Sequence, residues 1–199
     1  MTTAIVQYNA GNIRSVLYAL ERIGTTAIVT DDPEQLRSAD KVIFPGVGEA
    51  SSAMAYLKER GLDQVIAGLT QPVLGICLGM QLMCSWSEEN DTVCLGIFPE
   101  KVKRFRPADK LLKVPQIGWN NITRLKSSLF EGVAENSYCY FVHGYHAAIG
   151  SHTIATTDYG GDYSSGLHRE NFYGVQFHPE KSAAVGEQIL RNFLFKINT

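Results

Sequence analysis

The chain has 199 residues, 45% hydrophobic and 19% charged, which is the balance of a globular fold and predicts one domain over residues 1–199. Its net charge of −2 argues against a nucleic-acid-binding or membrane-surface protein. No apolar run approaches the ~18 residues of a membrane span and no signal peptide is visible, so we expect a cytoplasmic protein.

The N-terminal half alternates strand and helix patterns. Strands are predicted over 4–8, 26–30, 41–46 and 72–76. Helices are predicted from Ile13 to the closing Gly24, from Pro33 after the cap Asp32, and over 49–60, 62–69 and 78–86. Strands separated by helices of this length predict an α/β fold with a mostly parallel, doubly wound sheet flanked by helices.

The C-terminal half has closely spaced strand patterns over 138–145, 152–159, 163–170 and 172–179, with turns at 160–161 and 169–172. These patterns predict an antiparallel extension of the parallel sheet. A last helix is predicted over 184–195, and the basic segment 100–115 is predicted to be an irregular surface loop.

The four cysteines, Cys77, Cys84, Cys94 and Cys139, form no C-x-x-C pair, which weakens zinc and redox interpretations. We therefore expect neither a metal nor a cofactor. By count alone, each cysteine is more often a small buried hydrophobe than a catalyst.

One cysteine lies in a motif that is typical of a catalytic nucleophile. Cys77 lies in Gly75-Ile76-Cys77-Leu78-Gly79, a G-x-C-x-G version of the nucleophile elbow between a strand and a helix. Such a turn strains the nucleophile's backbone and directs the next amide, here that of Leu78, at an oxyanion. Alone, this motif leaves Cys77 open between a nucleophile and a buried thiol.

A thiol nucleophile needs a base and a group that orients the base. His178 ends an apolar strand in "GVQFHPEKS", and Glu180 lies two positions on, on the same side of an extended segment. Cys77, His178 and Glu180 could thus form a catalytic triad. The alternative is a turn with a solvated histidine and glutamate.

A second oxyanion donor is expected near the nucleophile. The turn "FPGVG" over 44–48 follows a predicted strand, and its glycines would let the amide of Val47 or Gly48 turn inward. It lacks the GK[ST] of a phosphate loop, and the alternative is a plain tight turn.

Together, "PGVG", "GICLGMQ" and "GVQFHPE" resemble the motifs of class I (triad-type) glutamine amidotransferases, in that family's order and across the whole chain. The stretches "YNAGNIRS", "VPQIGWN" and "YFVHGY" are similar to those of the glutaminase subunits of imidazole glycerol phosphate synthase, an enzyme of histidine biosynthesis. One departure is Gly144, where that family often has serine.

The resemblance implies that Cys77, His178 and Glu180 hydrolyse glutamine, with Val47, Gly48 and Leu78 as oxyanion donors. It implies glutamine binding by Gly46, Gly48, Gln81 and Glu89. It further implies a heterodimer with a (β/α)8 cyclase, which takes up the ammonia and converts N′-[(5′-phosphoribulosyl)formimino]-AICAR (PRFAR) to imidazole glycerol phosphate and AICAR. The candidate interface residues are Asn12, Trp119, Asn120, Tyr140 and Lys181.

Two hypotheses follow for regulation and for competing functions. The glycines of the Pro45–Gly48 loop suggest a gate, in which one peptide flip supplies or removes an oxyanion donor and leaves the isolated chain nearly inactive. A thiol peptidase, a γ-glutamyl hydrolase or a binding module with a dead site could use a similar sheet. Gln81 and the "YNAGN" and "GWN" stretches argue against the first two, and the complete triad argues against the third.

Overall fold

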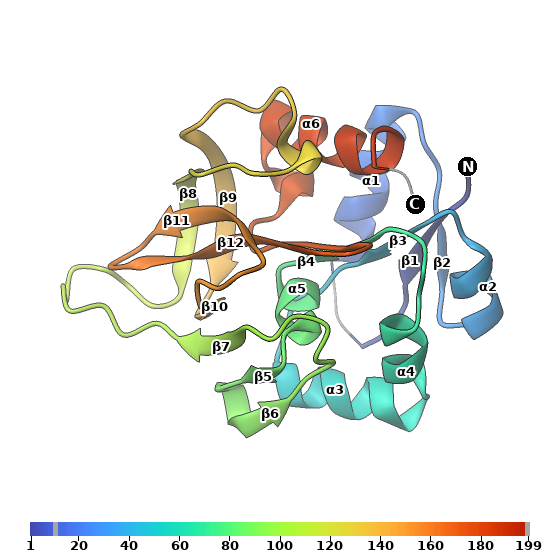
Figure 1. The fold of residues 1–199 in the computed structure, drawn as a ribbon, viewed down its shortest axis with the longest axis horizontal. Helices are drawn as coiled ribbons and strands as arrows, with labels where there is room; N and C mark the ends of the chain where they lie inside the picture. The colour runs from blue at the N-terminus through green and yellow to red at the C-terminus, as the bar shows by residue number, and fades with distance from the viewer. Residues whose placement is uncertain (10–11, 198–199) are drawn as a thin grey trace.

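The structure is a computed structural model that describes residues 1–9 and 12–197. Residues 10 and 11 of the "YNAGNIRS" stretch lie outside this described part. The structure is an α/β fold built on one large sheet, with helices on both faces and a small second sheet (Figure 1).

Five parallel strands form one half of the large sheet, in the order β2-β1-β3-β4-β13. Their bounds are β1 Thr3–Val6, β2 Ile28–Thr30, β3 Lys41–Phe44, β4 Val73–Ile76 and β13 Phe172–Val175. Because the strands are parallel, their carboxyl ends share one edge of the sheet, where ligands bind in open α/β sheets.

The helices of the described residues are α1 Ile13–Ile23, α2 Pro33–Ser38, α3 Ala50–Glu59, α4 Leu62–Ala67, α5 Leu78–Met83 and α6 Ala183–Phe195. Their ends follow local chemistry. Asp32 caps α2 by accepting from two backbone amides, with Pro33 at the first position, and Gly24 closes α1 in the left-handed conformation at φ 85°. Figure 1 shows α1 and α6 on one side of the parallel strands and α3, α4 and α5 on the other.

Alternating side chains of the strands supply two hydrophobic cores. Along β1, Ala4 and Val6 face the core that is shared with α2 to α5, whereas Ile5 faces the core that is shared with α1 and α6. Val42 and Ile43 of β3 divide in the same way. Burial of both faces explains why β1, β3, β4 and β13 have no polar face in the sequence, whereas the edge strand β2 leaves Ile28 exposed.

The other half of the large sheet continues from β13 through β12, β10, β7, β5 and β6, with β11 paired to β12. The bounds are β5 Trp86–Ser87, β6 Thr92–Val93, β7 Lys101–Arg104, β10 Tyr145–Ala147, β11 Thr153–Asp158 and β12 Asp162–Arg169. A separate antiparallel pair joins β8 Gln116–Ile122 to β9 Ser137–His143. Short 3₁₀ turns are η1 Glu89–Asp91, η2 Ser128–Phe130 and η3 Pro179–Lys181.

The predicted fold class, a mostly parallel sheet with an antiparallel extension, is confirmed, but two local predictions are wrong. The helix predicted over 78–86 ends at Met83, because backbone amides of the segment 95–98 bond to the carbonyls of Leu82, Met83 and Cys84. Part of the predicted loop 100–115 is the strand β7, which pairs with β10 and β5. None of the helices in the described residues has the length and apolar character that crossing a bilayer requires.

Candidate active site

Cys77 lies in the turn between β4 and α5. Its φ of 53° and ψ of −108° fall in a region that residues other than glycine rarely adopt, so the turn is strained as the motif predicts. The flanking glycines are required by close packing. A Cβ on Gly79 would lie 1.9 Å from the carbonyl oxygen of Phe44, and a Cβ on Gly75 would lie 2.8 Å from the backbone nitrogen of Met80.

His178 and Glu180 flank Pro179 just after β13. Glu180 Oε1 accepts a hydrogen bond from His178 Nδ1 at 2.8 Å, and both side chains are buried. Because a carboxylate oxygen accepts this bond, Nδ1 carries the proton and Nε2 is left for Cys77. Asn12 Nδ2 donates a second hydrogen bond to the same Glu180 oxygen.

These neighbours set the charge of His178. Burial by itself would lower its pKa, but hydrogen bonds with Cys77 and Glu180, and the charges of those groups, outweigh burial and raise the pKa from 6.5 to about 10. The imidazolium is therefore the favoured form at neutral pH. A cation beside the sulfur favours the thiolate, which is the nucleophilic form of cysteine.

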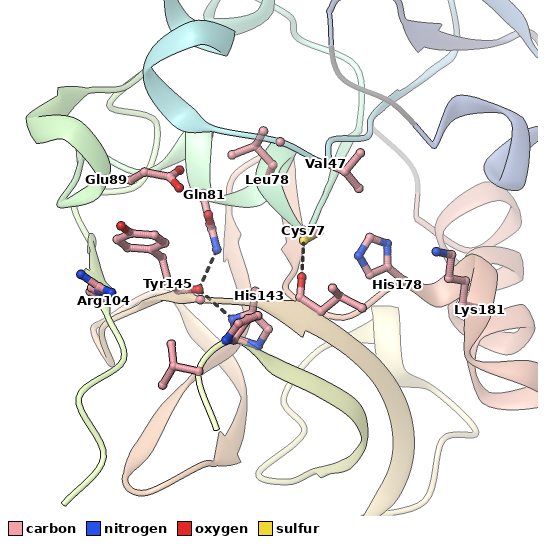
Figure 2. Close-up of a pocket in the computed structure, with 15 residues that line it drawn as sticks. Val47, Cys77, Leu78, Gln81, Glu89, Arg104, His143, Tyr145, His178 and Lys181 are labelled. Atoms are coloured by element: carbon pink, nitrogen blue, oxygen red, sulfur yellow. Dashed lines mark hydrogen bonds between the residues drawn. The ribbon is translucent and has the colours of Figure 1, made fainter. Parts of the chain in front are cut away.

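Cys77 and His178 open into one cavity of about 480 Å³ at the carboxyl ends of β4 and β13 (Figure 2). Segments far apart in the sequence supply its walls, among them the sequence-predicted residues Val47, Gly48, Leu78, Gln81, Glu89 and Lys181. The volume suits a small-molecule ligand.

The Pro45–Gly48 loop lies against the nucleophile turn. The Leu78 amide donates to the carbonyl oxygen of Gly46 at 3.3 Å. The carbonyl and amide of one trans peptide point in opposite directions, so the Val47 amide points away from Leu78. In this structure the amides of Leu78 and Val47, two of the predicted oxyanion donors, therefore do not converge on one point.

Tight contacts hold this loop and restrict its residues. Tyr8 donates to the carbonyl of Pro45 at 2.7 Å, and a Cβ on Gly46 would lie 2.3 Å from the Tyr8 hydroxyl. Gly48 has a φ of 123°, which favours glycine, although nothing lies within 4 Å of where its Cβ would be.

Gln81 and Glu89 lie in the wall of the cavity on the Arg104 side (Figure 2). Gln81 Nε2 donates to the carbonyl oxygen of Tyr145 at 2.8 Å. Glu89 Oε2 accepts from the Ala50 amide at 2.8 Å, and burial raises the pKa of this carboxyl against the effect of that bond. An amide and a carboxyl at one end of the cavity can bind the polar backbone groups of an amino acid.

A family model described as glutamine amidotransferase class-I matches residues 4–197. The chain belongs to the class I glutamine amidotransferases. This confirms the family that the three motifs predict.

Relatives of matching length show which class I glutamine amidotransferases the chain is similar to. The chain is 57% identical over 194 residues to the imidazole glycerol phosphate synthase subunit HisH of Bacteroides fragilis, covering 98% of this chain and 99% of that one. It is 45% identical over 194 residues to HisH of Idiomarina loihiensis, covering 98% and 97%. The predicted likeness to the glutaminase subunits of this synthase is therefore confirmed.

Solved structures support the fold. A crystal structure of a glutamine amidotransferase matches with a TM-score of 0.73 at 20% identity, covering 96% of each chain. PurLQS from Thermotoga maritima matches with a TM-score of 0.72 at 16% identity, covering 97% of each chain. Identities this low bear on the fold alone.

The predicted interface residues of this amidotransferase do not all lie on one surface. Trp119 is 52% exposed, and its ring lies edge-on to Tyr140 on the paired strand at 5.9 Å between centroids. Asn120 points to the opposite face of β8 and donates to the carbonyl of Asp158. Lys181 reaches the cavity beyond the triad, whereas Asn12 contacts Glu180.

Sequence reasoning missed several residues that lie around Cys77 and its cavity. Gln176, Val142 and His143 lie around Cys77 or line its cavity, and Tyr145 supplies the carbonyl that binds Gln81. Gln176 carried a usable signal, since it is a polar residue in an apolar strand two positions before His178. Across residues 1–9 and 12–197, no cluster of three or more His, Cys, Asp or Glu side chains could hold a metal ion.

Proposed function

We propose that this chain is the glutaminase subunit of an imidazole glycerol phosphate synthase in histidine biosynthesis. It hydrolyses glutamine to glutamate and ammonia and passes the ammonia to a (β/α)8 cyclase. The observation that carries this proposal is the buried His178–Glu180 pair beside a strained Cys77 at one small-molecule cavity. The HisH relatives at 57% identity support the choice of synthase.

The chemistry follows from the triad. The Cys77 thiolate attacks the side-chain carbonyl carbon of glutamine, and the carbonyl oxygen becomes an oxyanion. His178, held as imidazolium, gives its proton to the amide nitrogen, so that ammonia leaves and a glutamyl thioester remains. Neutral His178 then takes a proton from water, which attacks the thioester and releases glutamate and the thiolate.

Glutamine recognition is proposed for the groups beside the nucleophile. Gln81 and Glu89 would bind the α-amino end of the substrate, and Glu89 can pair with its ammonium group. Gly46 and Gly48 would let the loop backbone approach the ligand, since neither carries a side chain that could block it.

The Pro45–Gly48 loop is proposed as the gate on this activity. A flip of the Gly46–Val47 peptide would break the 3.3 Å bond to Leu78 and replace a carbonyl with the Val47 amide. The Leu78 and Val47 amides would then both be free to bind the oxyanion. We therefore expect the isolated chain to turn over little glutamine until its partner shifts the loop.

The partner is proposed to dock on the exposed face of the β8–β9 pair. Ile117, Trp119 and Tyr138 are 64%, 52% and 60% exposed, and β-strand alternation puts all three on one face with Tyr140. Aromatic residues are enriched in the cores of interfaces. Lys181, at the mouth of the cavity, would lie near the path of the ammonia.

The deciding experiment compares glutamine with ammonia as the nitrogen source. Cys77→Ala, combined with the cyclase and PRFAR, should abolish glutamine-dependent formation of imidazole glycerol phosphate and leave the ammonia-dependent rate unchanged. Cys84→Ala is the matched control, because Cys84 is buried at the far end of α5 and should leave both rates intact. Equal glutamine-dependent rates in Cys77→Ala and the wild type would refute the proposal.

A further inference from the structure

Gln176 follows β13 and is fully buried, yet its side-chain amide touches two groups of the site. Its Nε2 lies 3.6 Å from Cys77 Sγ, and its Oε1 lies 2.9 Å from Gln81 Nε2. Gln81 Nε2 also bonds the carbonyl oxygen of Tyr145 at 2.8 Å. The chain of contacts therefore runs from a backbone carbonyl, through two amides, to the nucleophile.

One backbone atom fixes the orientation of both amides. The Tyr145 carbonyl can only accept, so the group of Gln81 that faces it is its NH₂. The second N–H of that NH₂ meets Gln176, which must present its oxygen there. The remaining end of the Gln176 amide, which faces Cys77, is therefore its NH₂ donor.

This orientation also fixes what Gln81 offers to a ligand. Both of its N–H groups are used, by Tyr145 and by Gln176, so only its carbonyl oxygen is free. That oxygen accepts hydrogen bonds, which suits the ammonium or amide N–H groups of glutamine and not its carboxylate.

The surroundings of the sulfur divide into groups that favour the thiol and groups that favour the thiolate. The carbonyl oxygen of Val142, 3.7 Å from Sγ, accepts from a thiol and would repel a thiolate. The Gln176 N–H and the His178 imidazolium instead bind the anion, and a donor to a charged acceptor makes a stronger bond.

The other titratable groups near the sulfur stay uncharged at neutral pH. Burial raises the pKa of Tyr8 and of Tyr163, both of which interact with Cys77, and burial lowers the pKa of His143 to about 3. Besides the His178 imidazolium, the charged side chains of the cavity wall are Glu89, Arg104 and Lys181. Among the uncharged side chains of the described residues 1–9 and 12–197, Gln176 is the one that points an N–H at Sγ.

We propose that Gln176 is a catalytic residue, whose amide N–H stabilises the Cys77 thiolate while its carbonyl oxygen holds Gln81 ready for the substrate. The catalytic role of Gln176 rests on the proposed glutaminase function, but the experiment that tests its contact with Cys77 does not require glutamine hydrolysis. The sequence position, two residues before His178, places the thiolate donor and the general base on one rigid segment after β13.

The test measures the rate of Cys77 alkylation by iodoacetamide in the full-length chain as a function of pH, with the labelled cysteine identified by mass spectrometry. In Gln176→Met the donor is lost, so the pH at which alkylation is half-maximal should rise by about one unit. The rate at pH 7 should fall about tenfold, the scale of a charge-assisted hydrogen bond. A profile that superimposes on the wild type in a folded protein would overturn the proposal.

A second variant covers the case in which Gln176→Met does not fold. Gln176→Glu keeps the size and the acceptor for Gln81 but puts a negative oxygen beside the sulfur, so half-maximal alkylation should move to still higher pH. Gln176→Glu is used only if Gln176→Met does not fold, and an unshifted profile in it would then overturn the proposal, whereas the expected shift would support it.

Gln71→Met is the matched control. Gln71 is also a buried amide, donating to the carbonyl of Leu36 at 2.6 Å away from the cavity, so its loss should lower stability and leave the alkylation profile unchanged. Because alkylation needs no glutamine turnover, the result separates the two proposals. A shifted profile in the Gln176 variant, together with a wild-type chain that never hydrolyses glutamine, would remove the glutaminase proposal and leave the role of Gln176.

Discussion

The charge of His178 depends on the carboxylate behind it. In Glu180→Gln, one group that raises the His178 pKa from 6.5 to about 10 is lost, so this pKa falls. Loss of the imidazolium stops protonation of the leaving nitrogen, so the alkaline limb of kcat/KM should move to lower pH. Neutral-pH activity should drop on the order of 10³-fold, because a glutamine amide no longer fixes the tautomer.

The measurement is the pH profile of glutaminase activity in the complex with the cyclase. Glu34→Gln serves as the control, since Glu34 is an exposed partner of Arg37 on α2 and should leave the profile unchanged. An alkaline limb of Glu180→Gln at the wild-type position would contradict this account of His178.

The same pKa makes a prediction for stability. A histidine that titrates at about 10 when folded and near 6.5 when unfolded binds its proton more tightly in the folded state. Its contribution to the free energy of unfolding is therefore complete below pH ~6.5 and lost as the pH rises through about 10. Denaturant unfolding at several pH values should show this decline in the wild type and a smaller one in His178→Gln.

Single residues differ in how far sequence could predict them. The pairing of His178 with Glu180 was predictable from their sequence spacing, but the extended segment expected there is wrong. Glu180 lies in the 3₁₀ turn η3, which still brings its carboxylate to His178 Nδ1. The contacts of Gln176 and Asn12 were not predictable, since each bonds a partner from another part of the chain. A sequence gives the donor and acceptor types of such residues, but only the fold brings them together.

The turn that carries Cys77 depends on packing between two elements. A Cβ on Gly79 would overlap the backbone oxygen of Phe44 at the end of β3, and neither backbone can move freely. Gly79→Ala should therefore lower the free energy of unfolding by about 3 kcal/mol and disturb the position of Cys77. Denaturant unfolding and Cys77 alkylation check both parts.

Gly144 is the matched comparison for that variant. It also lies near the cavity, but a Cβ there would make only ordinary contacts of 3.9 Å with Pro115 and Val114. Gly144→Ala and Gly144→Ser should thus fold and turn over glutamine like the wild type. Equal destabilisation of the Gly79 and Gly144 variants would show that steric overlap is not the cause.

The loop after β3 allows activity to be separated from stability. Gly48 has open space where its Cβ would be, and its φ of 123° is the conformation that alanine resists. Gly48→Ala should fold with a loss of about 1 kcal/mol, yet lower kcat about 10²-fold by displacing an oxyanion donor. Normal kcat in this variant would argue against the loop as a gate.

Elements were predictable where local pattern and tertiary packing agree. The parallel strands β1, β3, β4 and β13 are buried on both faces, so their apolar runs stand out in the sequence. The strand β7 has one buried residue, Val102, among exposed basic ones, and its pairing partners are distant in the sequence. The apolar run that begins α5 continues past Met83, and tertiary hydrogen bonds from the segment 95–98 end the helix there.

At the scale of the whole molecule, the site forms where the two halves of the sheet meet. β4 brings Cys77, and β13 pairs beside it in parallel and brings Gln176 and His178 to the same edge. The register pairs Val175 with Ile76, so the residues that follow each strand emerge side by side. The antiparallel half and the β8–β9 pair then supply the far wall through Val142, His143 and Tyr145.

The exposed aromatic face of β8–β9 gives the prediction for assembly. Trp119 is 52% exposed and packs edge-on against Tyr140, a rigid anchor for a partner surface. Trp119→Ala should weaken binding to the cyclase by about 2 kcal/mol, near a 30-fold rise in Kd, and leave the stability of the isolated chain almost unchanged. Calorimetric titration of the chain with the cyclase measures the first, and thermal unfolding measures the second.

Val93→Ala is the control for loss of an exposed hydrophobic side chain, because Val93 is 64% exposed on β6, the last strand of the large sheet. Its Kd for the cyclase should match the wild type. If the β8–β9 face serves only to bind the cyclase, Trp119→Ala at saturating cyclase should recover most of its glutaminase rate, since occupancy is restored. Identical Kd values for both variants would place the docking surface elsewhere on the molecule.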